Sequence, residues 1–102
     1  MPRTGVQLGE SNEIKTMTRS EIIEVIEQAG HQHKMIWIRA KEKDGSIEPR
    51  AVEPYSFRPK GTQDKFFFWC SLHNGTRNFL IDNIDEVKIL EDDFAPRFPV
   101  EF

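Results

Sequence analysis

The sequence predicts a mainly β fold, in which one N-terminal helix precedes a small five-stranded barrel. Three observations lead to this prediction: a helical apolar repeat over residues 18–29, short strand-like runs over residues 35–90, and turn signals between those runs. The chain has 102 residues, which is enough for one domain and not for two. We therefore expect one domain at 17–95, a flexible leader at 1–16 and a tail at 96–102.

The helix is predicted from its start signal and its apolar stripe. Thr18 and Glu21 have the spacing of a capping box, in which each side chain bonds the backbone N–H of the other residue. Gly30 has the position of a residue that follows a helix end. The apolar residues recur at helical spacing and are Ile22, Val25, Ile26 and Ala29, with Ile23 widening the stripe. The stripe is wide enough to cover the second face of an aromatic strand.

An aromatic hairpin over residues 65–84 is the centre of the predicted barrel. Asn74-Gly75 joins its two strand-like runs and is a strong signal for a tight β-turn. Along the first run, Phe66 to Leu72, one face is expected to carry Phe66, Phe68, Cys70 and Leu72, and the other Phe67, Trp69 and Ser71. Both faces are apolar, so we expect the helix, a partner chain or a ligand to cover the second one. Cys70, the single cysteine, is expected to be a small buried hydrophobe.

The remaining strands flank this hairpin. Residues 35–41 alternate as a strand should, and residues 46–58 form a longer extended stretch that Pro49 and Pro54 should bend or confine to an edge. Residues 86–90 form the last strand, and Phe94 beyond it is expected to pack on the barrel. Five short strands separated by turns indicate a barrel of the Sm/SH3-like type, which closes its own edges.

The charge is unevenly distributed. The net charge is −3, yet residues 34–77 carry nine Lys/Arg and five Asp/Glu, a balance of +4, while residues 78–102 carry two and seven, a balance of −5. Two interpretations stay open, ordinary solvated charge and a local basic groove. No apolar run is long enough to span a bilayer and no signal peptide is visible. We therefore expect a cytoplasmic protein without a membrane partner.

Basic groups flank the aromatic strands. Guanidinium groups hold phosphate in bidentate geometry, and aromatic rings stack on bases, so the combination is suited to a nucleotide-like anion. The alternative is that the rings belong to the core and that Arg77 pairs with Asp82 or Glu53. The candidate ligand-binding residues are Trp37, Arg39, Arg50, Tyr55, Trp69, His73 and Arg77.

No motif indicates an enzyme. A catalytic triad, a Cys-His pair and a glycine-rich phosphate loop are all absent from the sequence pattern. His31 and His33 lie one residue apart, but no Cys or acidic cluster nearby completes a metal site. We therefore expect no catalytic residue, no metal and no cofactor.

Four short motifs occur in the order and spacing of the WYL domain, a bacterial regulatory module that this chain resembles from Glu21 to Phe94. They are Arg50-Ala51-Val52-Glu53-Pro54-Tyr55, Trp69-Cys70, Arg77-Asn78-Phe79 and Ile81-Asp82-Asn83-Ile84. The namesake triplet is absent, with Phe66-Phe67-Phe68 in its neighbourhood, and Asn83 stands where the family has a second arginine. The resemblance implies an Sm-like barrel that is usually attached to a helix-turn-helix domain and binds a nucleic-acid or nucleotide-like effector. No helix-turn-helix segment fits in this chain, so direct operator reading is not expected.

Two functions follow from these observations. The first is a non-enzymatic, ligand-sensing WYL-like domain in transcriptional or defence regulation, which binds an anionic effector such as single-stranded nucleic acid or a nucleotide near Arg50 and Arg77. The second is an interaction module without a nucleic-acid ligand, in which an exposed aromatic face contacts a regulatory protein or a second copy of the chain.

Overall fold

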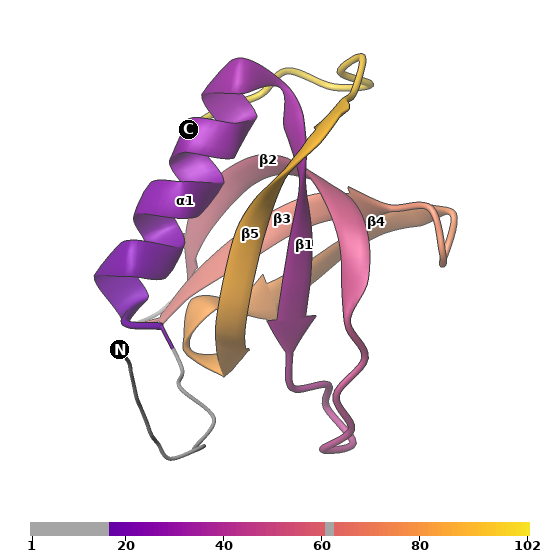
Figure 1. Cartoon of the computed structure of the whole chain (residues 1–102). Coiled ribbons are helices and arrows are strands. Elements are labelled where there is room, and N and C mark those ends of the chain that lie inside the picture. Colours follow the sequence, from indigo (N-terminus) through magenta and orange to yellow (C-terminus); the bar gives the residue numbers. More distant parts are fainter. Residues whose placement is uncertain (1–16, 61–62) are drawn as a thin grey trace, which may run out of the picture.

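The computed structural model describes residues 17–60 and 63–102 and shows one helix packed against a curved sheet (Figure 1). The predicted helix and five strands are confirmed, whereas the predicted leader at 1–16 lies outside the described residues. In chain order the elements are α1 (Arg19–Gln32), β1 (Lys34–Ala40), β2 (Arg50–Lys60), β3 (Gln63–Cys70), β4 (Gly75–Leu80), the 3-10 turn η1 (Ile81–Asn83) and β5 (Ile84–Asp93).

Helix α1 begins as predicted and ends later than predicted. The Thr18 hydroxyl accepts the Glu21 N–H at 3.2 Å, and the Glu21 carboxylate accepts the Thr18 N–H at 2.9 Å, which confirms the capping box. The expectation that Gly30 follows the helix end is wrong, because the helix ends at Gln32 and His33 takes the left-handed cap conformation with φ 56°. Gly30 is instead buried inside the helix, where the ring of Phe102 lies against its backbone.

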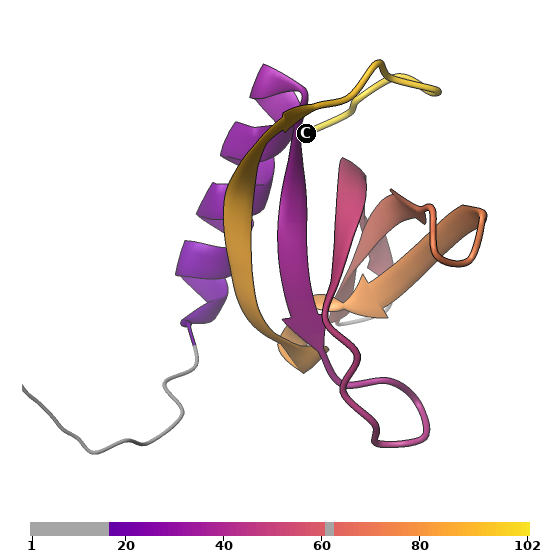
Figure 2. The same ribbon diagram turned by 45° about the vertical axis from the view of Figure 1, so that its right-hand side comes forward.

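The five strands form one antiparallel sheet in the order β4-β3-β2-β1-β5, so the mainly β fold class is confirmed. The last strand returns to pair with the first, with Ile38 opposite Val87. The sheet curls around its concave face (Figure 2). It does not close completely, because β4 and β5 remain its two edges and η1 joins them without a hydrogen-bonded ladder. The expected full closure of the barrel is therefore wrong among the described strands.

Strand β2 is irregular at its proline. Its register against β3 shifts between Pro54 and Ser56, as expected of a bend at this position. The strand nevertheless lies in the middle of the sheet, between β1 and β3, and does not run along an edge. Five consecutive residues of the strand, 52–56, are buried, so both faces of β2 are covered at this position.

The core lies on the concave face of the sheet. Phe66, Phe68 and Cys70 are fully buried there, which confirms their predicted inward face and the buried cysteine. The same expectation is wrong for Leu72, because β3 ends at Cys70 and Leu72 lies in the turn that follows, 61% exposed. Ile22 and Ile26 of α1 belong to the same cluster. The helix therefore covers the Phe66 and Phe68 side of the sheet, and the expectation that it covers the opposite side of β3 is wrong.

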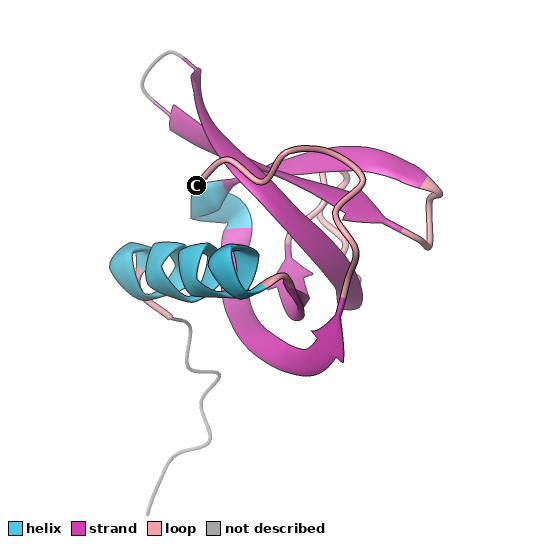
Figure 3. Cartoon of the chain, turned by 90° about the horizontal axis from the view of Figure 1, so that it is seen from above, coloured by secondary structure: helices cyan, strands magenta, loops and turns pink. Residues whose placement is uncertain are grey.

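The chain after β5 covers part of that opposite side. Residues 94–102 turn back across the sheet (Figure 3), and the Glu101 N–H donates to the Tyr55 carbonyl at 2.8 Å. The Tyr55 ring contacts the Phe94 and Phe98 rings edge-on, at centroid distances of 5.5 and 5.2 Å. Phe94 is buried, as predicted from the sequence. The C-terminal segment thus covers Tyr55 of β2, and its Arg97 lies over the ring of Trp69 of β3.

Candidate functional site

A cavity of about 750 Å³ opens between the β1–β2 connection and the edge strand β4. Residues from the β1–β2 connection and from Arg50 form one wall, and five consecutive residues, 76–80, form the other. Because neighbouring residues of a strand point to opposite faces, a cavity that touches all five runs along the unpaired edge of β4. Lys65, His73 and Asn83 complete the lining.

The lining is rich in charge and has a positive balance. Its three carboxylates are Glu42, Asp44 and Glu48, and its five cations are Lys41, Lys43, Arg50, Lys65 and Arg77. Of these cations, Arg50 is the one that forms an ion pair within the described part of the chain. The cavity therefore gathers four cationic side chains that have no internal counter-ion in residues 17–60 and 63–102.

Arg77 is exposed and faces this cavity. Neither salt bridge considered for it from the sequence is formed in the structure. Asp82 pairs with Arg19 at 2.6 Å, and Glu53 pairs with Arg97 at 3.1 Å. The register of the central hairpin places Arg77 directly opposite Phe68 and Phe79 opposite Phe66, so Arg77 lies two residues before the core residue Phe79 on the same, concave face of β4.

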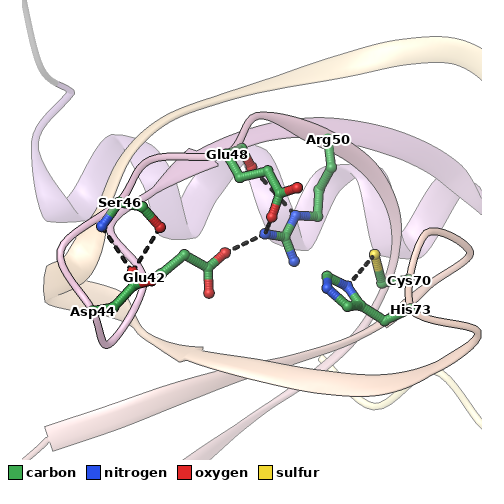
Figure 4. A network of polar contacts seen from close by, with 7 residues as sticks. All are labelled: Glu42, Asp44, Ser46, Glu48, Arg50, Cys70 and His73. Carbon is green, nitrogen blue, oxygen red and sulfur yellow. Dashed lines mark hydrogen bonds and ion pairs between the residues drawn. The ribbon is translucent and has the colours of Figure 1, made fainter.

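Arg50, in contrast, is enclosed and neutralised. Its side chain is only 4% exposed, and its guanidinium pairs with the carboxylates of Glu42 and Glu48, the latter at 3.0 Å (Figure 4). Its Nε also donates to the Glu48 carbonyl at 3.3 Å. The guanidinium carbon lies 5.6 Å from the centre of the Phe79 ring. Arg50 is thus a buried cation at the back of the cavity, with two acidic partners on the solvent side.

The turn that carries these acidic residues is held by Asp44. Its carboxylate accepts the Ser46 N–H at 2.9 Å and the Ser46 hydroxyl at 2.6 Å. These hydrogen bonds lower the pKa of Asp44 below its ordinary value of 3.8. Gly45 adopts φ 90°, which a residue with a side chain rarely takes. The turn is therefore ordered by Asp44 independently of Arg50.

His73 lies at the other end of the cavity and contacts Cys70. The His73 Nδ1 is 3.6 Å from the Cys70 sulfur (Figure 4), a Cys-His contact that the sequence pattern did not indicate. The thiol has no solvent exposure. The contact fixes the orientation of the imidazole at the rim of the cavity.

The other four candidate residues lie outside the cavity lining. On β1, Arg39 pairs with Glu86 at 3.3 Å, and the Trp37 ring centre lies 5.1 Å from the Lys88 ammonium. Tyr55 and Trp69 belong to the surface that the C-terminal segment covers. The structure thus brings together Arg50, His73 and Arg77 and separates them from Trp37, Arg39, Tyr55 and Trp69.

Tyr55 and Trp69 share one polar network with Arg97. The Tyr55 hydroxyl donates to the Glu53 carboxylate at 2.8 Å and accepts the Arg97 N–H at 2.8 Å. The Arg97 guanidinium pairs with Glu53 and lies 3.6 Å from the centre of the Trp69 ring. No local sequence pattern indicates this role of Arg97, because Arg97 lies 44 residues from Glu53.

Tyr55 should ionise only in strong alkali. Burial raises the pKa of Tyr55 to about 12 from its ordinary value of 10.0, and the hydrogen bond to Glu53 acts in the same direction. Because the folded state keeps the proton more tightly, its contribution to stability is complete below pH 10.0 and is lost as the pH rises toward about 12. Tyr55 is the single tyrosine, so tyrosinate absorbance during a pH titration reports on it directly. A midpoint near 10 in the folded protein would contradict this environment, and Tyr55→Phe should abolish the signal.

Two structural observations bear on other site classes. In residues 17–60 and 63–102, no three His, Cys, Asp or Glu side chains are grouped so that they could hold a metal ion. His31 lies near the Phe102 carbonyl, at 3.4 Å, while the His33 ring contacts Phe94. Within the same described part of the chain, no helix combines the length and apolar character needed to cross a membrane.

Comparisons with known proteins identify the family. The family model for the WYL domain matches residues 21–89, about two-thirds of the chain. A solved structure, the proteasome accessory factor B/C (PafBC) of Arthrobacter aurescens, superimposes with a TM-score of 0.69 at 17% identity. The similarity covers 83% of this chain but only 15% of that one. No curated protein sequence matches the chain. The fold, the order of the motifs and the family match agree, and the chain belongs to the WYL domain family.

Proposed function

We propose that this WYL domain is a non-catalytic sensor for an anionic effector, which binds in the basic cavity between the β1–β2 connection and β4. The observation that carries the proposal is the set of four cationic side chains, Arg77 among them, that line the cavity without an internal counter-ion in the described part of the chain. Guanidinium groups bind phosphate in bidentate geometry and ammonium groups bind it as point charges, so a cluster of both suits a phosphate ligand. Single-stranded nucleic acid or a nucleotide, serving transcriptional or defence regulation, fits this chemistry.

The dimensions and the edge strand support an extended ligand. A cavity of about 750 Å³ lies within the range of small-molecule sites, and it follows the free edge of β4. Strand-edge N–H groups supply further donors to phosphate oxygens. The rings of Trp37 and Trp69 each have a cation over the ring, so base stacking there would require Lys88 or Arg97 to move.

Arg77→Ala should weaken the binding of a fluorescein-labelled oligothymidylate by about tenfold or more, because it removes charged hydrogen bonds to phosphate. Anisotropy titrations at two salt concentrations measure the effect, and the wild-type affinity should fall with salt. Arg58→Ala is the matched control, since Arg58 is an exposed cation that pairs with Glu101 outside the cavity. Equal losses in the two variants would show that only net charge matters and would reject the cavity as the site.

A second candidate function is protein interaction at the rim of the cavity. Ile47 and Leu72 are 51% and 61% exposed, and each neighbours a lining residue in the chain. Exposed large apolar side chains are typical of contact surfaces. A dimeric mass in size-exclusion chromatography that Leu72→Ser converts to a monomer, without oligonucleotide binding by the wild type, would favour this function.

A further inference from the structure

The cavity contains its own anions, and they are bound to its most buried cation. We infer that Glu42 and Glu48 compete with the effector for Arg50, and that effector binding exchanges these carboxylates for phosphate groups. This inference rests on the proposed function, because it concerns how the same cavity admits its ligand. Figure 4 shows both carboxylates directed toward the Arg50 guanidinium.

The burial of the three side chains supports an exchange of partners. The Arg50 side chain is 4% exposed, whereas those of Glu42 and Glu48 are 28% and 52% exposed. A guanidinium at this depth requires an anionic partner, because an unpaired buried charge is strongly unfavourable. The carboxylates come from the open side and satisfy that requirement in the absence of a ligand. A phosphate that enters from the same side can satisfy it equally well.

The local structure allows the carboxylates to leave without unfolding the turn. Asp44 and Ser46 hold the turn by their own hydrogen bonds, and the Ser46 carbonyl accepts the Glu42 N–H at 2.7 Å. Neither contact involves the Glu42 or Glu48 side chain. Rotation of those two side chains is therefore sufficient to expose Arg50 to the cavity.

The exchange sets a requirement on the ligand. Arg77 and the lysines of the lining have no internal counter-ion in the described chain, so a first anionic group can bind there without displacing anything. Arg50 becomes available only to a group that replaces two carboxylates. The cavity should therefore prefer a ligand with at least two neighbouring phosphate groups over a single monovalent anion.

The test compares three variants that each remove one negative charge from the same cavity. Glu42→Gln and Glu48→Gln free Arg50 from a competitor, whereas Asp44→Asn removes a carboxylate that bonds only Ser46. We expect the two glutamine variants to bind the labelled oligothymidylate about tenfold more tightly than wild type, and Asp44→Asn to change affinity by no more than about twofold. Arg50→Gln combined with Glu48→Gln should lose the gain.

The outcomes separate this inference from the proposed function. Equal gains in all three variants would indicate general electrostatics, and weaker binding by the glutamine variants would indicate that the carboxylates position Arg50 for the ligand. Both results overturn the inference while leaving the cavity as the site. Binding that Arg77→Ala does not weaken overturns the proposed function and the inference together. A glutamine variant that is unfolded alone but folds when the oligonucleotide is added supports the exchange. If one of the two glutamine variants does not fold under either condition, the affinity of the other variant decides whether the inference holds.

Discussion

Phe68→Ala should lower the free energy of unfolding by about 3–5 kcal/mol. Phe68 has no solvent exposure and lies between two other rings, with centroid distances of 5.2 Å to Phe66 and 5.3 Å to Phe79. The substitution removes this buried ring from the cluster that joins the sheet to α1 and leaves a space that the neighbours fill only in part. A loss of this size is a large fraction of the ~5–15 kcal/mol that stabilises a typical domain. Urea denaturation followed by circular dichroism measures it.

Phe67→Ala is the matched control for this prediction. The two residues are adjacent and identical, but Phe67 points to the other face of β3 and is only partly buried. The expected loss is about 1–2 kcal/mol, because less apolar area leaves water on folding at that position. Similar losses in the two variants would mean that the two faces of β3 are equally buried, which would contradict the packing of α1 on one face only.

The parts of the fold that the sequence predicts well depend on neighbouring residues. The Thr18–Glu21 capping box forms within three residues, and Asn74 adopts φ 52° within the turn before β4. The alternation along β3 correctly separates Phe66 and Phe68 from Phe67. In each case the signal and the structure lie within a few residues, so the local rules are sufficient.

The covering of the sheet depends on long-range contacts and was not predictable in the same way. The register shift at Pro54 buries Tyr55 against the C-terminal segment, and a sequence pattern does not indicate on which residue such a shift falls. Arg97 reaches Trp69 and Glu53 from the tail, with nothing in its neighbourhood to indicate that contact. The local pattern leaves the helix, a partner chain and a ligand as possible covers for the second face of β3 and does not indicate the tail.

The candidate site likewise combines features that the sequence predicts with features that it does not. Arg50 and Arg77 were expected to lie near one another, and they line one cavity. Their environments differ because Arg50 has acidic partners in the β1–β2 connection and Arg77 has none in the described chain. Glu48 lies two residues before Arg50 in an extended segment, where such neighbours share a face, so this partner was open to prediction. Whether Lys65 lines the cavity depends on how the strands curl, and the sequence does not reveal that curvature.

Gly30→Ala should reverse its effect on stability when Phe102 is also changed. A Cβ at Gly30 would lie 2.3 Å from two atoms of the Phe102 ring, so the ring must shift or leave. In the wild-type background this crowding costs about 2–3 kcal/mol, the upper part of the range for overpacked sites, and outweighs the ~1 kcal/mol that alanine gains over glycine inside a helix. In a Phe102→Ala background the nearest remaining atom is the Val100 Cγ1 at 3.4 Å, an ordinary contact distance, and the same substitution should stabilise the protein by about 1 kcal/mol.

The four proteins of this double-mutant cycle, compared by urea denaturation, should give a coupling energy of about 2–3 kcal/mol between Gly30 and Phe102. Such a value would establish that glycine is required at position 30 because the returning tail approaches the helix backbone, and not because the helix ends there. Gln28→Ala, at an exposed position of the same helix, serves as the control and should show no coupling to Phe102. Stabilisation by Gly30→Ala in both backgrounds would mean that the Phe102 ring does not occupy this position in solution. The final residues would then have no part in holding α1 against the sheet.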